Sequence, residues 1–330
     1  MKLRREQKRM IMRTFTIVTS IIAIIFCTFL PVRAEDTSQG KSVVRLMTFN
    51  IWRNGRAGEQ PLSQTVKVIK MAKADIVGLQ EANAHTTKLI ADMLGWYHSG
   101  TILSRYKIVE EGKRGIEVLL DSGQKVFVFN VHLSHAPYQP YQLLGIPYAN
   151  GKFIKTEKEA IEEANKARGQ QIAALLKDIN DISNRNQPVF VTGDFNEPSH
   201  LDWTAKATAA GRHPIKVAYP TTRSLTDDGF IDVYRTVYPD EIKFPGYTWT
   251  PTTKSNNPKD HHDRIDFVFA RGKGIKVENA QVVGENRKNA DIVVTPYPSD
   301  HRAVVTTFTI GSTAKTNRSA NACLNVPGGD

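Results

Sequence analysis

The sequence has few cysteines, because only Cys27 and Cys323 occur in 330 residues. Cys27 lies inside an apolar run near the N-terminus, and Cys323 lies in a small, polar C-terminal stretch. We expect the first to be lost with a leader peptide, which leaves Cys323 without a partner for an internal disulfide. The disulfide-stapled class is therefore excluded, and a chain of this length can bury enough apolar surface to rely on its core.

Long apolar runs are also rare, and the main one extends from Phe15 to Leu30. Basic residues precede this run, and Val32-Arg33-Ala34 follows it. Such an order is typical of a secretory signal peptide, and it predicts that residues 1–34 are removed after Ala34. The alternative is an uncleaved membrane anchor, because about 17 apolar residues is close to the shortest transmembrane span. Cleavage implies a secreted protein.

Much of the positive charge lies in the predicted leader. The first 34 residues carry seven Lys or Arg and one Glu, so their removal lowers the formal net charge from +11 to +5. Proteins that bind duplex nucleic acid usually present a clear basic footprint. The overall charge therefore indicates export more than it indicates nucleic-acid binding.

Helix-like and strand-like segments follow one another from residue 43 to 310 without a linker or an internal repeat. The longest predicted helix begins at Thr156, where Thr-Glu-Lys-Glu forms a capping box, and its apolar face extends to Ile182. Two further helices are predicted over 61–74 and 84–94. Strands are predicted over 43–51, 75–80, 116–120, 126–133, 188–192, 264–270, 276–283 and 303–310. The alternation favours one α/β domain.

Two stretches have no regular apolar spacing. Residues 134–151 are rich in Pro, Tyr and Gly, and residues 251–262 are polar. Both are predicted to be surface loops, which often carry specificity. Residues 311–330 are small and polar and are predicted to form a disordered tail, so the domain is predicted over 41–310.

Polar and ionisable side chains gather where the predicted strands begin or end. Asn50 and Glu81 end the first two strands, and Asp194 directly follows the strand that ends at Thr192. Since ligands of α/β sheets bind at strand ends, these side chains are predicted to share one site. Asp266 lies inside an apolar strand, where a carboxylate needs a partner or a cation. The full set is Asn50, Glu81, His132, Asp194, Asn196, Asp266, Asp300 and His301.

The types of side chain in this set limit its chemistry. Amide and carboxylate oxygens are hard ligands that suit Mg²⁺, Mn²⁺ or Ca²⁺, whereas a zinc site usually shows several His or Cys at close spacing. A metal held by one or two carboxylates keeps positions for water and a phosphate oxygen. A His beside an Asp can stabilise a charged transition state, and an Asp near an Asn can orient the attacking water. Such a set can therefore support phosphoester hydrolysis.

Seven short motifs in one order carry a resemblance to a known family. They are Thr48-Phe49-Asn50, Leu79-Gln80-Glu81, Ser104-Arg105-Tyr106, Asn130-Val131-His132-Leu133, Gly193-Asp194-Phe195-Asn196, Arg264-Ile265-Asp266-Phe267 and Ser299-Asp300-His301. In this order the sequence resembles the endonuclease/exonuclease/phosphatase family, which includes DNase I-like nucleases, AP endonucleases, sphingomyelinases and inositol-polyphosphate phosphatases. Each motif alone is weak, but seven in order are specific, and they span about residues 43–310. The family fold is a four-layer α/β sandwich, in which two facing mixed β-sheets are flanked by helices.

The resemblance also implies a role for each polar residue. Asn50 and Glu81 would hold the metal ion, and Asp300 would lie beside it. Mg²⁺ is the expected ion, with Mn²⁺ and Ca²⁺ as alternatives. Asp194 would align and activate the attacking water, and Asn196 would contact the scissile phosphate.

The remaining roles concern the transition state and the substrate. By the same resemblance, His132 and His301 would stabilise the transition state and assist the leaving group. Asp266 would pair with His301, which fixes the tautomer of the imidazole and raises its pKa. Tyr138 and Tyr141, in the loop after His132, are predicted substrate contacts because they could stack a base or meet a lipid headgroup.

Other basic residues have no supporting motif. His98, His200 and His213 are predicted to be surface or structural residues, and His261 is only near Asp266 in sequence. Arg168, on the long predicted helix, is predicted to lie on a solvated face.

The sequence thus predicts a secreted, metal-dependent phosphodiesterase, with nucleic acid or a nucleotide as the first substrate. A sphingomyelinase or phospholipase C-like activity and a phosphatase for inositol phosphates or other monoesters remain as alternatives. A non-catalytic surface binding protein on the same fold would have lost at least one of four residues that are all present: Glu81, Asp194, Asp266 and His301. No segment indicates an obligate protein partner, and a monomer is expected.

Overall fold

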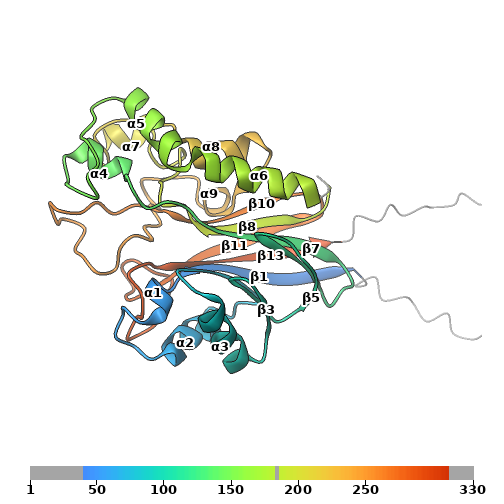
Figure 1. The fold of residues 1–330 in the computed structure, drawn as a ribbon. Coiled ribbons are helices and arrows are strands. Elements are labelled where there is room, and N and C mark those ends of the chain that lie inside the picture. The colour runs from blue at the N-terminus through green and yellow to red at the C-terminus, as the bar shows by residue number, and fades with distance from the viewer. Residues whose placement is uncertain (1–39, 183–185, 312–330) are drawn as a thin grey trace, which may run out of the picture. The chain divides into compact units, whose positions relative to one another are not determined.

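The computed structural model describes residues 40–182 and 186–311. The predicted leader and residues 312–330 of the predicted tail lie outside these residues, whereas Gly311 is the last residue of a strand. Two mixed β-sheets face each other, and helices cover the outer face of each (Figure 1). The predicted architecture of two facing sheets flanked by helices is therefore confirmed. Within the described residues, no helix combines the length and the apolar character needed to cross a membrane.

The first sheet, sheet A, has seven strands. In spatial order they are β12 (Ile292–Val293), β11 (Ile275–Gly284), β13 (Ala303–Gly311), β1 (Lys41–Asn50), β2 (Ile76–Gln80), β4 (Ile102–Ser104) and β3 (Tyr97–Ser99). Sheet B has six strands, in the order β5 (Lys107–Glu111), β6 (Gly115–Leu119), β7 (Lys125–His132), β8 (Val189–Asp194), β10 (Asp266–Arg271) and β9 (Ile231–Asp232). Strands β2, β8 and β10 are buried along their whole length, as expected for strands covered on both faces.

The helices are distributed over the two outer faces. Sheet A is covered by α2 (Leu62–Met71) and α3 (Ala84–Leu94), and the short turn α1 (Trp52–Gly55) follows β1. On the side of sheet B lie α4 (Gln139–Leu144), α5 (Glu157–Ala164), α6 (Gln170–Ile182), α7 (Ala205–Ala209) and α8 (Pro220–Asp227) (Figure 1), and the π-helical turn η1 (Asn165–Gly169) joins α5 to α6. Helix α9 (Val233–Val237) packs against β10 of sheet B and against β11 of sheet A. The capping box predicted at Thr156 is confirmed, because Thr156 and Glu159 bond each other's backbone N–H groups.

Apolar side chains fill the space between the layers. Val44 and Phe308 of sheet A pack in one cluster with Phe190 and Val268 of sheet B. Separate clusters join α2 and α3 to sheet A, and α6 to sheet B. The two sheets are thus held face to face by a continuous core, which fixes the strand ends relative to each other.

Two sequence-based predictions about exposure are wrong. Residues 134–151 are not simply a surface loop, because they form α4 and bury Tyr138 and Tyr141. Arg168 does not face solvent but is 0% exposed. Its guanidinium donates to Glu197 over 2.9 Å and to the carbonyl oxygen of Ser134 over 2.9 Å. Partners supplied by distant loops, which helical periodicity cannot reveal, explain the burial of this arginine.

The strand registers bring the polar residues to one edge of the sandwich. In sheet B, Asp194 is aligned with His132 on the parallel strand β7 and with Asp266 on the antiparallel strand β10. In sheet A, Asn50 is aligned with Gln80, so Glu81 follows at the same edge. Strand β13 is antiparallel to β1 and therefore begins where β1 ends, next to His301.

Candidate active site

A cavity of about 600 Å³ opens at this edge, between the ends of the two sheets. Its polar lining includes Glu81, His132, Asp194, Asn196, Asp300 and His301. A larger cavity of about 860 Å³ surrounds Lys41 and Asp121. That larger cavity is lined by a single carboxylate and no histidine, so the smaller one is the candidate active site.

Asp194 lies at the centre of the polar cluster. One of its oxygens, Oδ2, accepts a hydrogen bond from Asn50 Nδ2 over 2.9 Å and lies 3.4 Å from His132 Nε2 and 3.7 Å from His301 Nε2. Burial alone would raise the pKa of Asp194, but the two histidines and Asn50 outweigh it and lower this pKa to about 2. The carboxylate therefore stays ionised across the whole physiological range.

His301 lies between two buried carboxylates. Its Nδ1 is 2.9 Å from Asp266 Oδ2, and its Nε2 faces Asp194. Burial opposes protonation of the imidazole, but the charges of Asp266 and Asp194 raise the pKa of His301 to about 10. Burial also keeps the pKa of Asp266 above its ordinary value, although His301 opposes that shift. Because His301 faces two acidic groups, His301 is an imidazolium and its partner Asp266 is a carboxylate.

His132 is the more accessible of the two histidines, since 34% of its side chain is exposed. Burial lowers the pKa of His132, but the hydrogen bond and the charge of Asp194 outweigh it, so that the net shift is upward. His132 therefore presents a readily protonated imidazole to the cavity.

Glu81 and Asp300 line the side of the cavity that fits a hard cation, and the buried Asn50 lies next to Glu81. Asn50 Nδ2 donates to Glu81 Oε1 over 3.2 Å. Asp300 Oδ1 is buried and has no hydrogen-bond partner among the described residues. Burial, together with the charge of Glu81, raises the pKa of Asp300 to about 6. A buried carboxylate oxygen without a partner, next to a second carboxylate, is the arrangement that a divalent cation would satisfy.

The backbone around Glu81 is strained in a way that orients this carboxylate. Trp52, Arg53 and Asn54 have φ of 55°, 49° and 62°, and Glu81 itself has φ of 55°. The left-handed region costs a non-glycine residue about 1–2 kcal/mol. Hydrogen bonds hold the strained conformation, because the Arg53 N–H donates to Glu81 Oε2 over 2.7 Å and the Asn54 N–H donates to the Glu81 carbonyl oxygen over 2.7 Å. Strain that is maintained in this way is typical of functional sites.

Asn196 is fixed beside Asp194. Its N–H donates to Asp194 Oδ1 over 2.9 Å, and its Nδ2 donates to the carbonyl oxygen of Leu133 over 3.0 Å. These bonds join the loop after β8 to the loop after β7. All eight polar residues predicted from the strand ends therefore meet at one edge, and their individual roles remain predictions.

The two predicted substrate tyrosines lie in the wall of the cavity. Tyr138 donates its hydroxyl to Asp263 Oδ2 over 2.7 Å, and Tyr141 donates its hydroxyl to Asp260. Since both hydroxyl protons are donated to carboxylates, neither tyrosine can donate its hydroxyl to a substrate. Tyr148, which is 40% exposed, lies edge-on to Tyr141 with ring centroids 5.6 Å apart. It is the most accessible of the three.

Several lining residues were not identified from the sequence. Arg53 and Lys259 place cationic side chains at the cavity, and Trp249 packs against His301 with ring centroids 5.0 Å apart. Within the described residues, neither Arg53 nor Lys259 forms an ion pair. The sequence places Arg53 three residues after Asn50 and places Lys259 in the predicted loop 251–262, whereas no pattern in the sequence marks Trp249.

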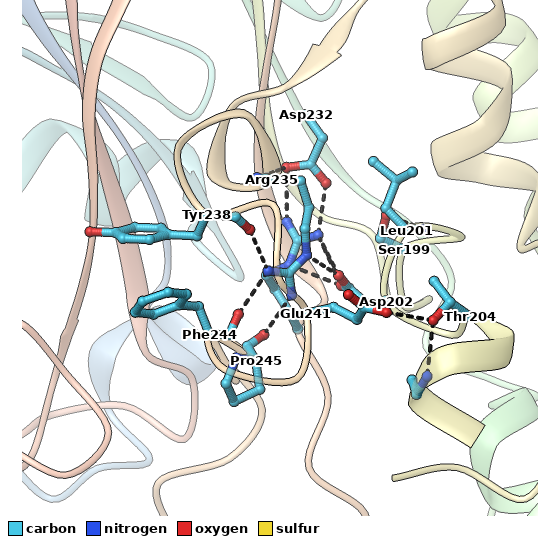
Figure 2. Close-up of polar contacts among 12 residues, drawn as sticks. Ser199, Leu201, Asp202, Thr204, Asp232, Arg235, Tyr238, Glu241, Phe244 and Pro245 are labelled. Carbon is cyan, nitrogen blue, oxygen red and sulfur yellow. Dashed lines mark hydrogen bonds and ion pairs between the residues drawn. The ribbon is translucent and has the colours of Figure 1, made fainter. Parts of the chain in front are cut away.

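A buried ionic network supports the start of β10. Arg264 donates to Asp202 over 2.9 Å and to Asp232 over 2.7 Å. Figure 2 shows how Arg235 joins the same network, donating to Asp202 and to the carbonyl oxygens of Tyr238, Phe244 and Pro245. The network fixes the backbone two residues before Asp266, and it thereby positions this carboxylate toward His301.

Comparison with known proteins places this geometry in a family. The sequence model of the endonuclease/exonuclease/phosphatase family matches residues 47–301, which include every polar residue of the site. The chain belongs to this family. Family members are phosphoester hydrolases and usually depend on a divalent metal.

A curated relative and solved structures agree with this assignment. An uncharacterized Caenorhabditis elegans protein, F14F9.5, is 30% identical over an alignment of 332 positions. The alignment covers 88% of this chain and 99% of that protein. The fold is similar to that of endonuclease/exonuclease/phosphatase proteins from Beutenbergia cavernae and Bacteroides vulgatus, each with a TM-score of 0.52 over 82% of this chain. Those two structures are 19% and 16% identical to this chain, and the matches cover 72% and 99% of their own lengths.

Proposed function

We propose that this protein is a divalent-metal-dependent phosphodiesterase that acts on nucleotides or nucleic acid. The observation that carries the proposal is the row of His132, Asp194, His301 and Asp266 beside Asp300, whose buried Oδ1 has no partner in the described part of the chain. Such a set can orient water and stabilise negative charge on a phosphoryl group.

The residues around Asp300 fit a hard cation. Glu81 and Asp300 would hold the ion through carboxylate oxygens, with the amide oxygen of Asn50 nearby, and the bound ion would supply neutralisation of phosphoryl charge. Asn50 Oδ1 accepts the Trp52 N–H over 3.0 Å and keeps a second lone pair. We propose Mg²⁺ as the ion, since the set lacks the soft ligands that select other metals.

The chain's own residues account for the remaining steps. Asp194 reaches the cavity as an ionised carboxylate and orients the attacking water by accepting its hydrogen bond. Protonated His301 lies beside it and stabilises the charge that develops on the phosphoryl oxygens. His132, the more exposed imidazole, donates a hydrogen bond or a proton to the leaving oxygen.

The lining of the cavity supports a nucleotide as the substrate. The exposed ring of Tyr148 provides a surface on which a base can stack, and such stacking contributes about 1–3 kcal/mol per base. Arg53 and Lys259 add positive charge that suits further phosphate groups. A volume of about 600 Å³ fits a few nucleotides or one strand end better than a duplex.

A substrate panel tests this proposal. Purified residues 35–330 should hydrolyse bis(4-nitrophenyl) phosphate and single-stranded oligonucleotides in Mg²⁺, and a chelator should abolish both activities. The substitution Tyr148→Ala should raise KM for the oligonucleotide but not for bis(4-nitrophenyl) phosphate. Tyr97 is an exposed tyrosine outside the cavity, so the control Tyr97→Ala should change KM for neither substrate. Hydrolysis confined to phosphomonoesters or sphingomyelin vesicles would overturn the substrate assignment.

We also propose that the protein is secreted. The proposal depends on the sequence alone, because residues 1–39 lie outside the described part of the chain. N-terminal sequencing of material recovered from the medium should begin at Glu35. A full-length chain retained in the membrane fraction would contradict cleavage.

A further inference from the structure

A second cluster of metal-binding side chains lies outside the candidate active site. His213 follows α7, and His261 and Asp263 precede β10. His213 Nδ1 lies 3.2 Å from His261 Nε2, which in turn lies 3.7 Å from Asp263 Oδ1. All three atoms lie within 4.8 Å of one another. The cluster joins two segments that are about fifty residues apart in sequence.

The spacing of these atoms suits zinc. Zinc binds His nitrogen and carboxylate oxygen at about 2.0–2.2 Å, so the edges of a tetrahedral site are about 3.3–3.6 Å long. The two nearer distances, 3.2 and 3.7 Å, lie close to this length. Two imidazoles and one carboxylate also form a ligand set that zinc commonly uses. A hard cation would favour a site made of oxygens alone.

Neighbouring groups orient the three ligands. Asp263 Oδ1 accepts the Trp203 Nε1–H over 2.9 Å, and Asp263 Oδ2 accepts the Tyr138 hydroxyl. The His213 ring stacks on buried Trp203, with centroids 4.1 Å apart and an interplanar angle of 12°. Such outer partners are typical of metal ligands, because they fix the direction of each lone pair.

The cluster can be reached from solvent on the side of His261. A small cavity of about 10 Å³ beside the cluster is lined by His213 and Asp263 but not by His261, and Arg212, Arg235 and Arg264 also line it. The His261 side chain is 17% exposed, so an ion can reach the cluster from solvent.

We propose that His213, His261 and Asp263 bind one Zn²⁺ ion, separate from the hard-cation site at Glu81 and Asp300. Bound zinc would tie the segment after α7 to the segment that leads into β10. Through Asp263 it would also hold Tyr138 in the wall of the active-site cavity. The alternative is a hydrogen bond from His261 Nε2–H to His213 Nδ1, with no metal.

Zinc binding separates the two alternatives. Purified residues 35–330 are stripped with a chelator and titrated with Zn²⁺ in excess Mg²⁺, which competes with Zn²⁺ for the hard-cation site. Calorimetry should give one Zn²⁺ per chain for the wild type, for Glu81→Gln and for the exposed-histidine control His85→Gln. His213→Gln and His261→Gln should lose the site. Tyr138→Phe, which removes only the hydroxyl donor to Asp263, should weaken binding by roughly 10- to 100-fold.

Two further readouts keep the test independent of activity and of folding. Cobalt bound in place of zinc should give visible absorption bands in the wild type and in Glu81→Gln, but not in His213→Gln. Circular dichroism establishes that each variant is folded. Zinc should raise the Tm of the wild type but should not change the Tm of His213→Gln or His261→Gln. The zinc proposal would be overturned if the wild type bound no zinc, or if folded His213→Gln and His261→Gln bound zinc as tightly as the wild type. Neither outcome would affect the phosphodiesterase proposal.

Discussion

Each ionisable residue in the candidate active site sets the protonation of its neighbour. Asp266 and Asp194 flank His301 at 2.9 and 3.7 Å, and this arrangement explains a pKa of about 10 for a buried imidazole. The same imidazolium helps to lower the pKa of Asp194 to about 2. The residues therefore act as a unit, and substitutions within the unit should not have additive effects.

Kinetics of Asp266 and His301 variants test this coupling. Asp266→Asn should lower kcat by roughly 10² or more, the scale of one general acid–base or oxyanion contact, because it removes the charge that keeps His301 protonated. His301→Ala should cost a similar factor, and the double variant should be little worse than either single variant. Rates on one phosphodiester give all three values. Fully additive losses, or a near-normal rate for Asp266→Asn, would mean that the two residues do not work together.

The dependence of stability on pH gives a second test at this scale. The pKa of His301 is raised to about 10 in the folded state, so protonated His301 stabilises the fold fully below about 6.5, and this contribution is lost as the pH rises toward 10. The difference in free energy of unfolding between the wild type and His301→Gln should therefore shrink over that interval. Urea denaturation of metal-free protein, with exposed His85→Gln as the control, measures it. A difference that stays constant from pH 6 to 10 would contradict the raised pKa.

At the scale of elements, local sequence signals predicted some boundaries well. The helix over 84–94 was predicted to end before Gly95, and Gly95 is the left-handed residue that ends α3. The π-helical turn η1 was not predictable, because it surrounds Arg168, whose partners Glu197 and Ser134 come from distant loops. Helix α4 was missed for the same reason, since tertiary contacts bury its residues. Local patterns contain no information about such partners.

The buried pair of Arg168 and Glu197 should be essential to the packing of this region. Both side chains are 0% exposed, and removing one partner leaves the other charge buried without compensation. Arg168→Leu should therefore lower the free energy of unfolding by about 3–5 kcal/mol. Lys177→Leu, an exposed cation on α6 that pairs with Asp181, should cost less than about 1 kcal/mol. Urea denaturation gives both values, and equal small losses would contradict the assigned role of Arg168.

At the scale of the whole molecule, the site needs both sheets. Sheet A supplies Asn50 and the residues that follow β2, whereas sheet B supplies His132, Asp194 and Asp266. The order of the seven motifs predicted that these residues would meet, because in this order the sequence resembles a family with this fold. The motifs could not reveal the cluster of His213, His261 and Asp263, because the sequence gives no sign that His213 lies beside Asp263. Residues that belong to no motif become neighbours only when the chain folds.

The metal side of the site can be tested without activity. Glu81→Gln keeps the shape of the side chain but removes one of the charges that a hard cation needs, so its affinity for Mg²⁺ or Mn²⁺ should fall. Titration calorimetry with metal-free protein measures this change, and Glu110→Gln, an exposed carboxylate on β5, is the matched control. If the two variants bind the metal equally well, Glu81 is not a ligand.

The central claim is that this edge of the sandwich hydrolyses phosphodiesters with the help of a divalent cation. The most direct measurement is the rate of bis(4-nitrophenyl) phosphate hydrolysis by the wild type and by Asp194→Asn, each in Mg²⁺ and in excess chelator. The wild type should be active only with Mg²⁺, and Asp194→Asn should be slower by roughly 10²- to 10⁴-fold while remaining folded. A wild-type rate that survives the chelator, or an unchanged rate for Asp194→Asn, would contradict the claim.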